Sequence, residues 1–196
     1  MDETRICKQM DFILEIDKAK NIIRQTYLSD GVRKENDAEH SWHTAIMAFV
    51  LAEYFDKNID VLKVMKMMLM HGIIEIDAGD TYCYDEKAAL TQADRERKAA
   101  ERIYSLLPED QAREYMDLWL EFEGKETPES KYCAILDRLQ PSVLNYANKG
   151  VSWKEHGVCF GQVMGRNAVT LNGPEEISSY FKNLIDNAVE NGYLKK

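Results

Sequence analysis

Apolar side chains recur every three or four positions along most of this chain, which is the period of amphipathic α-helices. Asp37 and Asp60 are placed to cap the second and third of these segments. Pro141 is expected to end or kink the helix that carries Asp137. The pattern predicts helices over residues 8–27, 37–54, 61–71 and 86–107, two more that begin at Pro108 and Pro128, and a last one over 174–190.

The rest of the chain is less regular. Residues 148–173 are richer in Gly and Asn, and only a short helix near 160–168 is expected there. No segment alternates apolar and polar positions as a strand would. Because no repeat, low-complexity tract or linker divides the sequence, we predict an all-α fold with one domain over residues 1–196.

Composition narrows the function before any motif is considered. The net charge of −9 argues against nucleic-acid polymers and anionic membranes as partners, but a small phosphorylated substrate remains compatible with it. No apolar run is long enough to span a membrane, and the N-terminus has no signal pattern. The four cysteines lie far apart without a CxxC pair, which favours free thiols in a reducing cytoplasm.

Three short segments carry the candidate chemistry. Residues 39–42 read EHSW, residues 71–81 read HGIIEIDAGDT, and residues 136–139 read LDRL. Together they resemble the active-site framework of HD-domain metal-dependent phosphohydrolases, in the branch that includes the bacterial 5′-deoxynucleotidases. The resemblance spans nearly the whole chain and implies an HD-domain helical bundle.

The resemblance also implies a role for each candidate residue. His40, His71 and Asp137 would bind a divalent transition metal, with Mn, Co, Zn, Fe and Ni not distinguished. Two carboxylates on either side of a phosphate ester can serve as acid and base when their pKa values differ, and the matching pair is Glu75 and Asp80.

Phosphate contacts are expected from two arginines. Arg24 matches the phosphate-contacting arginine of this branch, and Arg33 is the second choice for substrate binding. His43 lies three residues after His40 and His156 lies in the irregular region. Both are interpreted as packing or structural residues.

Gly72 departs from the family pattern. The family has an aspartate after the histidine that matches His71, and this aspartate contributes an oxygen to the metal. Losing it should cost at least the roughly 10–100-fold in affinity or activity that a lost supporting partner costs. A water, or a shift of Glu75 or Asp77, would fill the gap, or Gly72 would simply be a helix C-cap.

The sequence thus predicts a metal-dependent phosphohydrolase that cleaves nucleoside 5′-monophosphates, with a metal site weakened by Gly72. The alternative is a catalytically impaired nucleotide-binding or regulatory module. A helical interaction module without a small ligand would make the whole set of motifs a coincidence. Members of this branch are often dimers, so a homodimer is among the expected states.

Overall fold

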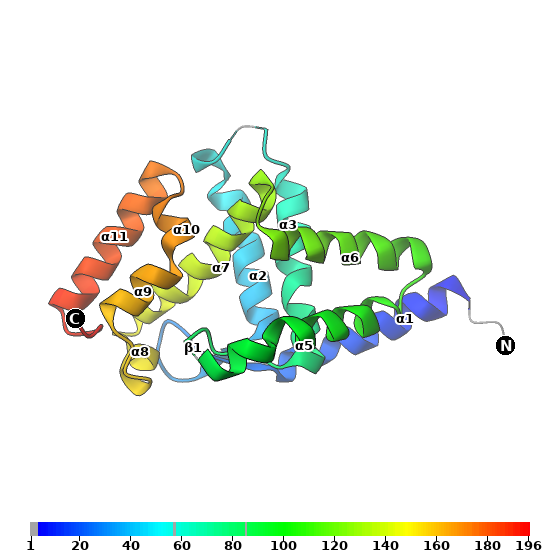
Figure 1. Ribbon diagram of the computed structural model, residues 1–196, viewed down its shortest axis with the longest axis horizontal. Helices are drawn as coiled ribbons and strands as arrows, with labels where there is room; N and C mark the ends of the chain where they lie inside the picture. Colours follow the sequence, from blue (N-terminus) through cyan, green and yellow to red (C-terminus); the bar gives the residue numbers. More distant parts are fainter. Residues whose placement is uncertain (1–3, 57, 85) are drawn as a thin grey trace.

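Helices dominate the computed structural model, which describes residues 4–56, 58–84 and 86–196 (Figure 1) and confirms the all-α class. None of its helices is both long and apolar enough to cross a membrane. The longer helices are α1 (Arg5–Ile16), α2 (Asp37–Val50), α3 (Val61–Met70), α5 (Glu86–Tyr104), α6 (Glu109–Gly124), α7 (Pro128–Ala147) and α11 (Glu175–Glu190). The shorter helices are η1 (Asp17–Asn21), η2 (Ala52–Tyr54), η3 (His71–Ile74), α4 (Glu75–Ala78), α8 (Val151–Glu155), α9 (Phe160–Arg166) and α10 (Ala168–Leu171).

The first predicted helix is wrong over its second half. It ends at Ile16 and, after η1, the chain forms strand β1 (Ile23–Tyr27), which pairs antiparallel with β2 (Lys34–Asn36). Two features explain the difference: β-branched and aromatic residues favour extended backbone, and Gly31 supplies a φ of +71° in the connecting turn. The hairpin matters because it places Arg24 and Glu35 beside the start of α2.

Local chemistry accounts for most helix boundaries. Asn36, and not Asp37, is the N-cap of α2: its side chain accepts from the backbone N–H of Glu39, whose side chain returns a bond to the backbone N–H of Asn36. Asp60 caps α3 as predicted, by accepting from the N–H of Lys63. Asp37 therefore does not cap α2.

Helix α7 passes between the two groups of helices seen in Figure 1 and contacts α2, α3 and α6 on one side and α10 and α11 on the other. Of the two outcomes predicted for Pro141, an end of the helix is wrong, since α7 continues to Ala147, and a kink stays a prediction. A proline lacks the N–H that would bond the carbonyl four residues earlier, so the carbonyl of Asp137 loses that partner, but the helix tolerates the loss.

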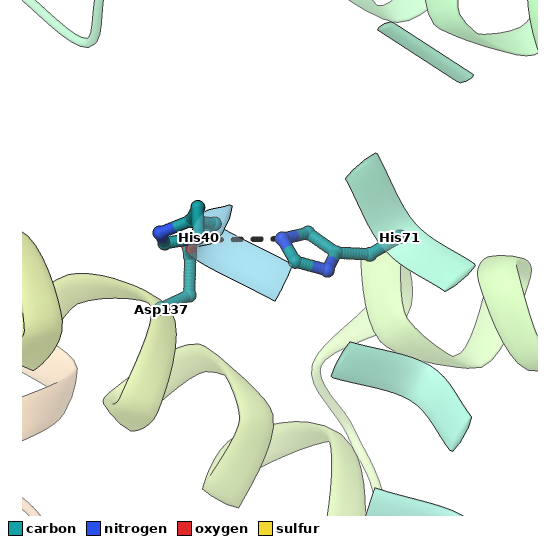
Figure 2. Close-up of side chains that lie close together, drawn as sticks. All are labelled: His40, His71 and Asp137. Carbon is teal, nitrogen blue, oxygen red and sulfur yellow. Dashed lines mark hydrogen bonds and ion pairs between the residues drawn. The ribbon is translucent and has the colours of Figure 1, made fainter. Parts of the chain in front are cut away.

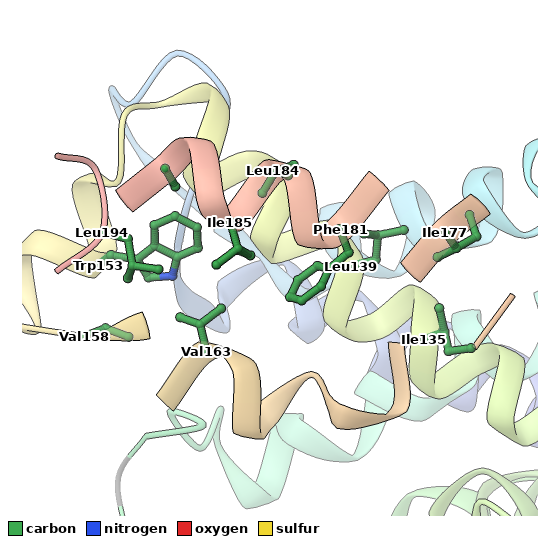
Figure 3. Packing of buried hydrophobic residues seen from close by; sticks show 11 residues of the cluster. Ile135, Leu139, Trp153, Val158, Val163, Ile177, Phe181, Leu184, Ile185 and Leu194 are labelled. Carbon is green, nitrogen blue, oxygen red and sulfur yellow. The ribbon is translucent and has the colours of Figure 1, made fainter. Parts of the chain in front are cut away.

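Buried apolar side chains form separate clusters on the two sides of α7. The C-terminal cluster joins α7, α9 and α11 through residues such as Leu139, Val163 and Phe181 (Figure 3). Another cluster joins α2, α3, α6 and α7 around Met68 and Leu136. Because α7 contributes to both, the face that carries Asp137 is held between two packed units.

Candidate metal centre and cavity

His40, His71 and Asp137 converge from three separate elements (Figure 2). His40 lies in the first turn of α2, His71 opens η3 directly after α3, and Asp137 lies midway along α7. Asp137 Oδ1 lies 3.1 Å from His40 Nε2 and 3.7 Å from His71 Nε2. One ligand atom from each residue lies within 4.8 Å of the other two.

This donor set fits a divalent transition metal. Two imidazole nitrogens and one carboxylate oxygen are a common set for such ions, and three protein ligands leave positions open. Two atoms bound to one cation at about 2.1 Å are separated by roughly 3.0 Å at a right angle and roughly 3.6 Å at about 120°. The observed separations of 3.1 and 3.7 Å match that range.

Hydrogen bonds behind the two histidines fix which nitrogen faces the centre. His71 Nδ1 donates to the carbonyl oxygen of Met68 at 2.8 Å, which leaves the Nε2 lone pair directed towards Asp137. His40 Nδ1 lies 3.1 Å from Gln140 Oε1. The Gln140 amide is oriented by its own bond, in which Nε2 donates to Glu35 Oε2 at 2.9 Å. His40 Nδ1 must therefore donate, and its Nε2 also faces Asp137.

The charges at this centre reinforce one another. Burial raises the pKa of Asp137, but its contacts with His40 and His71 outweigh that effect and hold the pKa well below its usual range. Burial and Arg24 lower the pKa of His40, but hydrogen bonding to Asp137 and Glu35 raises it overall. Asp137 is thus an ionised carboxylate, as a metal ligand must be.

The centre opens into a cavity of about 390 Å³ that Glu75 and Asp80 also line. Burial, and then the charge of Asp37, raise the pKa of Glu75 well above its usual value. Burial also raises the pKa of Asp80, although Arg24 counteracts it. One oxygen of Glu75 is buried without a hydrogen-bond partner among the described residues.

Arg24 lines the cavity as expected, but three carboxylates already surround its guanidinium. Arg24 Nε donates to Glu35 at 3.2 Å, and its Nη1 lies 3.3 Å from Asp37 and 3.9 Å from Asp80. The structure does not bring Arg33 into the cavity: its side chain is 56% exposed and forms a two-bond pair with Glu39. That pair also supports the cap of α2, which explains why Arg33 points along the surface.

Gly72 is buried within η3, and its backbone is not left-handed. The C-cap interpretation is therefore wrong, because a capping glycine takes a positive φ and this one continues a right-handed turn. A Cβ built on Gly72 would lie 3.3 Å from Ser41 Oγ, a tight contact that needs the serine hydroxyl to move by a few tenths of an ångström. Residue 72 thus faces the residue next to His40.

Comparison with known proteins agrees with this geometry. The sequence pattern of a family described as HD domain matches residues 16–178. The chain belongs to the HD-domain family. Its fold also superposes on a crystal structure titled predicted metal-dependent phosphohydrolase from Magnetospirillum magnetotacticum. The TM-score is 0.94 with 48% identity, and the match covers 99% of this chain and 97% of the other.

Curated relatives of this HD-domain protein are more distant. The 5′-deoxynucleotidases HDDC2 of Homo sapiens and Bos taurus are 27% and 26% identical to it over 132 residues. Those matches cover 67% of this chain and 63% of each relative. The chain therefore spans less than two thirds of the length of the curated relatives it matches.

Several residues behind the metal centre or in the cavity wall of the HD-domain protein were not predicted from the sequence. Gln140 lies three residues after Asp137, on the same helix face, and that spacing could have identified it. Glu35 had no local signal, because its partners are distant in sequence. Arg138 and Arg166 also line the cavity. His43 accepts from Gln140, and His156 packs against a tyrosine ring, so neither joins the three converging ligands.

Proposed function

We propose that this protein is a metal-dependent phosphohydrolase that releases inorganic phosphate from nucleoside 5′-monophosphates, with deoxynucleotides as the preferred class. The observation that carries the proposal is the convergence of His40, His71 and Asp137 at a cavity that two further carboxylates line. The names of the relatives support the nucleotide class. The cavity is also large enough for such a ligand, because small-molecule sites begin at about 300 Å³.

His40, His71 and Asp137 would hold the metal, with Gln140 and Met68 fixing the imidazole orientations. A bound divalent cation would polarise the phosphate and lower the pKa of water next to it. The residues do not select among Mn, Co, Zn, Fe and Ni, since imidazole and carboxylate suit all of them.

Glu75 and Asp80 divide the proton transfers. Burial, and then the charge of Asp37, raise the pKa of Glu75 well above its usual value, which makes Glu75 the acid that would donate a proton to the leaving 5′-oxygen. Burial raises the pKa of Asp80 less than that of Glu75, and Asp80 Oδ1 lies 3.9 Å from Arg24 Nη1. Asp80 is therefore the base that accepts a proton from attacking water.

The test is phosphate release by metal-stripped protein after each metal is returned separately. Asp137→Asn keeps the shape of the side chain, removes its charge, and should reduce turnover by at least about 100-fold, together with bound metal. Asp117→Asn on the exposed side of α6 is the matched control. Glu75→Gln should reduce turnover while metal content stays at the parental value. Equal turnover by Asp137→Asn and the parent would refute the proposal.

Because Gly72 replaces a metal ligand of the family pattern, the same experiment also tests a second function. A protein that binds nucleotide but releases no phosphate with any of the metals would be a regulatory or nucleotide-binding module. Equilibrium binding of a deoxynucleoside monophosphate, measured beside the release assay, separates the two functions. A homodimer also stays a prediction, which sedimentation of the metal-loaded protein would check.

A further inference from the structure

Two arginines that line the cavity have guanidinium groups without a partner among the described residues. Arg138 follows Asp137 on α7, Arg166 lies in the last turn of α9, and both line the same cavity. Within the described part of the chain, neither guanidinium makes an ion pair or a hydrogen bond, and Arg138 Nε is buried without an acceptor. Arg166 is exposed and can meet water, whereas a buried donor such as Arg138 Nε rarely lacks an acceptor.

The contrast with Arg24 is the second observation. Arg24 lies among Glu35, Asp37 and Asp80, so carboxylates already satisfy its charge and its donors. An incoming phosphate would have to compete with these carboxylates and would be repelled by them. Within the described residues no carboxylate forms an ion pair with Arg138 or Arg166, in a protein whose net charge is −9.

The two arginines share one cavity. Both side chains belong to its lining, one from α7 and one from α9, so two positive charges face the same space. An anion bound between them would offset their mutual repulsion. Guanidinium groups are suited to this because their planar donors match phosphate oxygens in pairs.

We propose that Arg138 and Arg166 form an oxyanion-binding pair that receives the phosphate group of the substrate. That the anion is the substrate's phosphate rests on the proposed function. The position of Arg138 directly after Asp137 places the bound phosphate beside the metal centre, on the α7 face that Pro141 and Asn145 continue along the cavity wall. Arg24 then acts as a positioning residue that holds the carboxylates.

The experiment measures inorganic phosphate binding by calorimetry in the presence of chelator, so that the arginines are tested apart from the metal. Arg138→Gln and Arg166→Gln should each weaken phosphate binding by at least about tenfold. Arg166→Lys keeps the charge but loses the paired donors, and should fall between parent and Arg166→Gln. Arg113→Gln is the matched control, because Arg113 is exposed on α6 and pairs with Glu109.

Thermal melting checks that each variant is folded. If Arg138→Gln does not fold, Arg166→Gln still tests the inference, because Arg166 is exposed and its replacement should leave the fold intact. Phosphate affinities of both folded variants within about twofold of the parent would overturn the inference, and so would a parent that binds no phosphate. If the parent releases phosphate and the arginine variants bind phosphate as tightly as the parent does, only this inference is refuted. Arginine-dependent phosphate binding without any turnover refutes only the proposed function.

Discussion

Restoring a carboxylate at position 72 is the sharpest test of how this centre binds metal. A side chain at residue 72 begins 3.3 Å from Ser41 Oγ, and Ser41 is the neighbour of His40. Since Gly72 also follows His71 directly, we expect a carboxylate there to reach the ion that the two histidines would hold. The backbone allows the substitution, because Gly72 is not left-handed and a helical glycine is less stable than alanine by roughly 0.5–1 kcal/mol.

We predict that Gly72→Asp tightens metal binding by roughly 10–100-fold, the factor lost when a supporting partner is removed. That factor corresponds to about 1.4–2.7 kcal/mol at saturating metal. For a protein of this size, metal should then raise the melting temperature of Gly72→Asp by roughly 3–11 °C more than it raises that of the parent. In chelator the sign should reverse, because a carboxylate at this buried position would have no cation to offset its charge.

The assay is a paired cobalt and manganese titration, with melting curves in metal and in chelator and phosphate release measured in parallel. Gly72→Asn has the same shape without the charge, and Gly72→Ala adds only the Cβ. If Gly72→Asp and Gly72→Asn bind metal equally, a side chain at residue 72 does not reach the ion and the reasoning fails. Efficient turnover by the parent, unchanged in Gly72→Asp, would show that another group replaces the missing ligand.

Two further changes test the fold around the site. Gln140→Leu removes the amide that Glu35 accepts from, and should destabilise the protein by roughly 1–3 kcal/mol in urea unfolding; an unchanged midpoint would contradict the buried network. Gly150→Ala should be far more damaging than Gly157→Ala, although both have positive φ, because only the first Cβ would collide with a backbone oxygen, that of Tyr193. Equal melting temperatures of the two alanine variants would count against this packing.

Much of the fold follows from the sequence where helical spacing is strong. The bounds of α2, α3, α5 and α11 lie close to those predicted, because apolar spacing and capping residues act locally. The strand at Ile23 was missed because its partner strand is short and is defined by a hairpin, not by alternation. The helix does not end at Pro141, one of the two outcomes predicted there, because packing on both sides of α7 outweighs one lost backbone bond. That residues 1–196 form one domain, and that the protein is cytoplasmic, stay predictions.

The candidate site is predictable only in part. Family resemblance indicated His40, His71 and Asp137, and the structure brings these three together. Resemblance could not show that Arg24 is surrounded by carboxylates or that Arg33 lies outside the cavity. Those facts depend on side-chain positions that a single sequence does not encode locally. That Arg138 lacks a partner among the described residues can be recognised only from the positions of the surrounding side chains.

The hydrogen bonds behind His40 have a consequence for how the site assembles during folding. Gln140 is 100 residues from His40 and 105 from Glu35, so the network forms only when distant parts of the chain close on each other. Contacts of such separation form late, because the chain entropy of loop closure is lost before they are gained. Metal affinity is then a property of the finished fold, and cobalt absorption in a refolding experiment should rise with the slowest phase, well after the helices have formed.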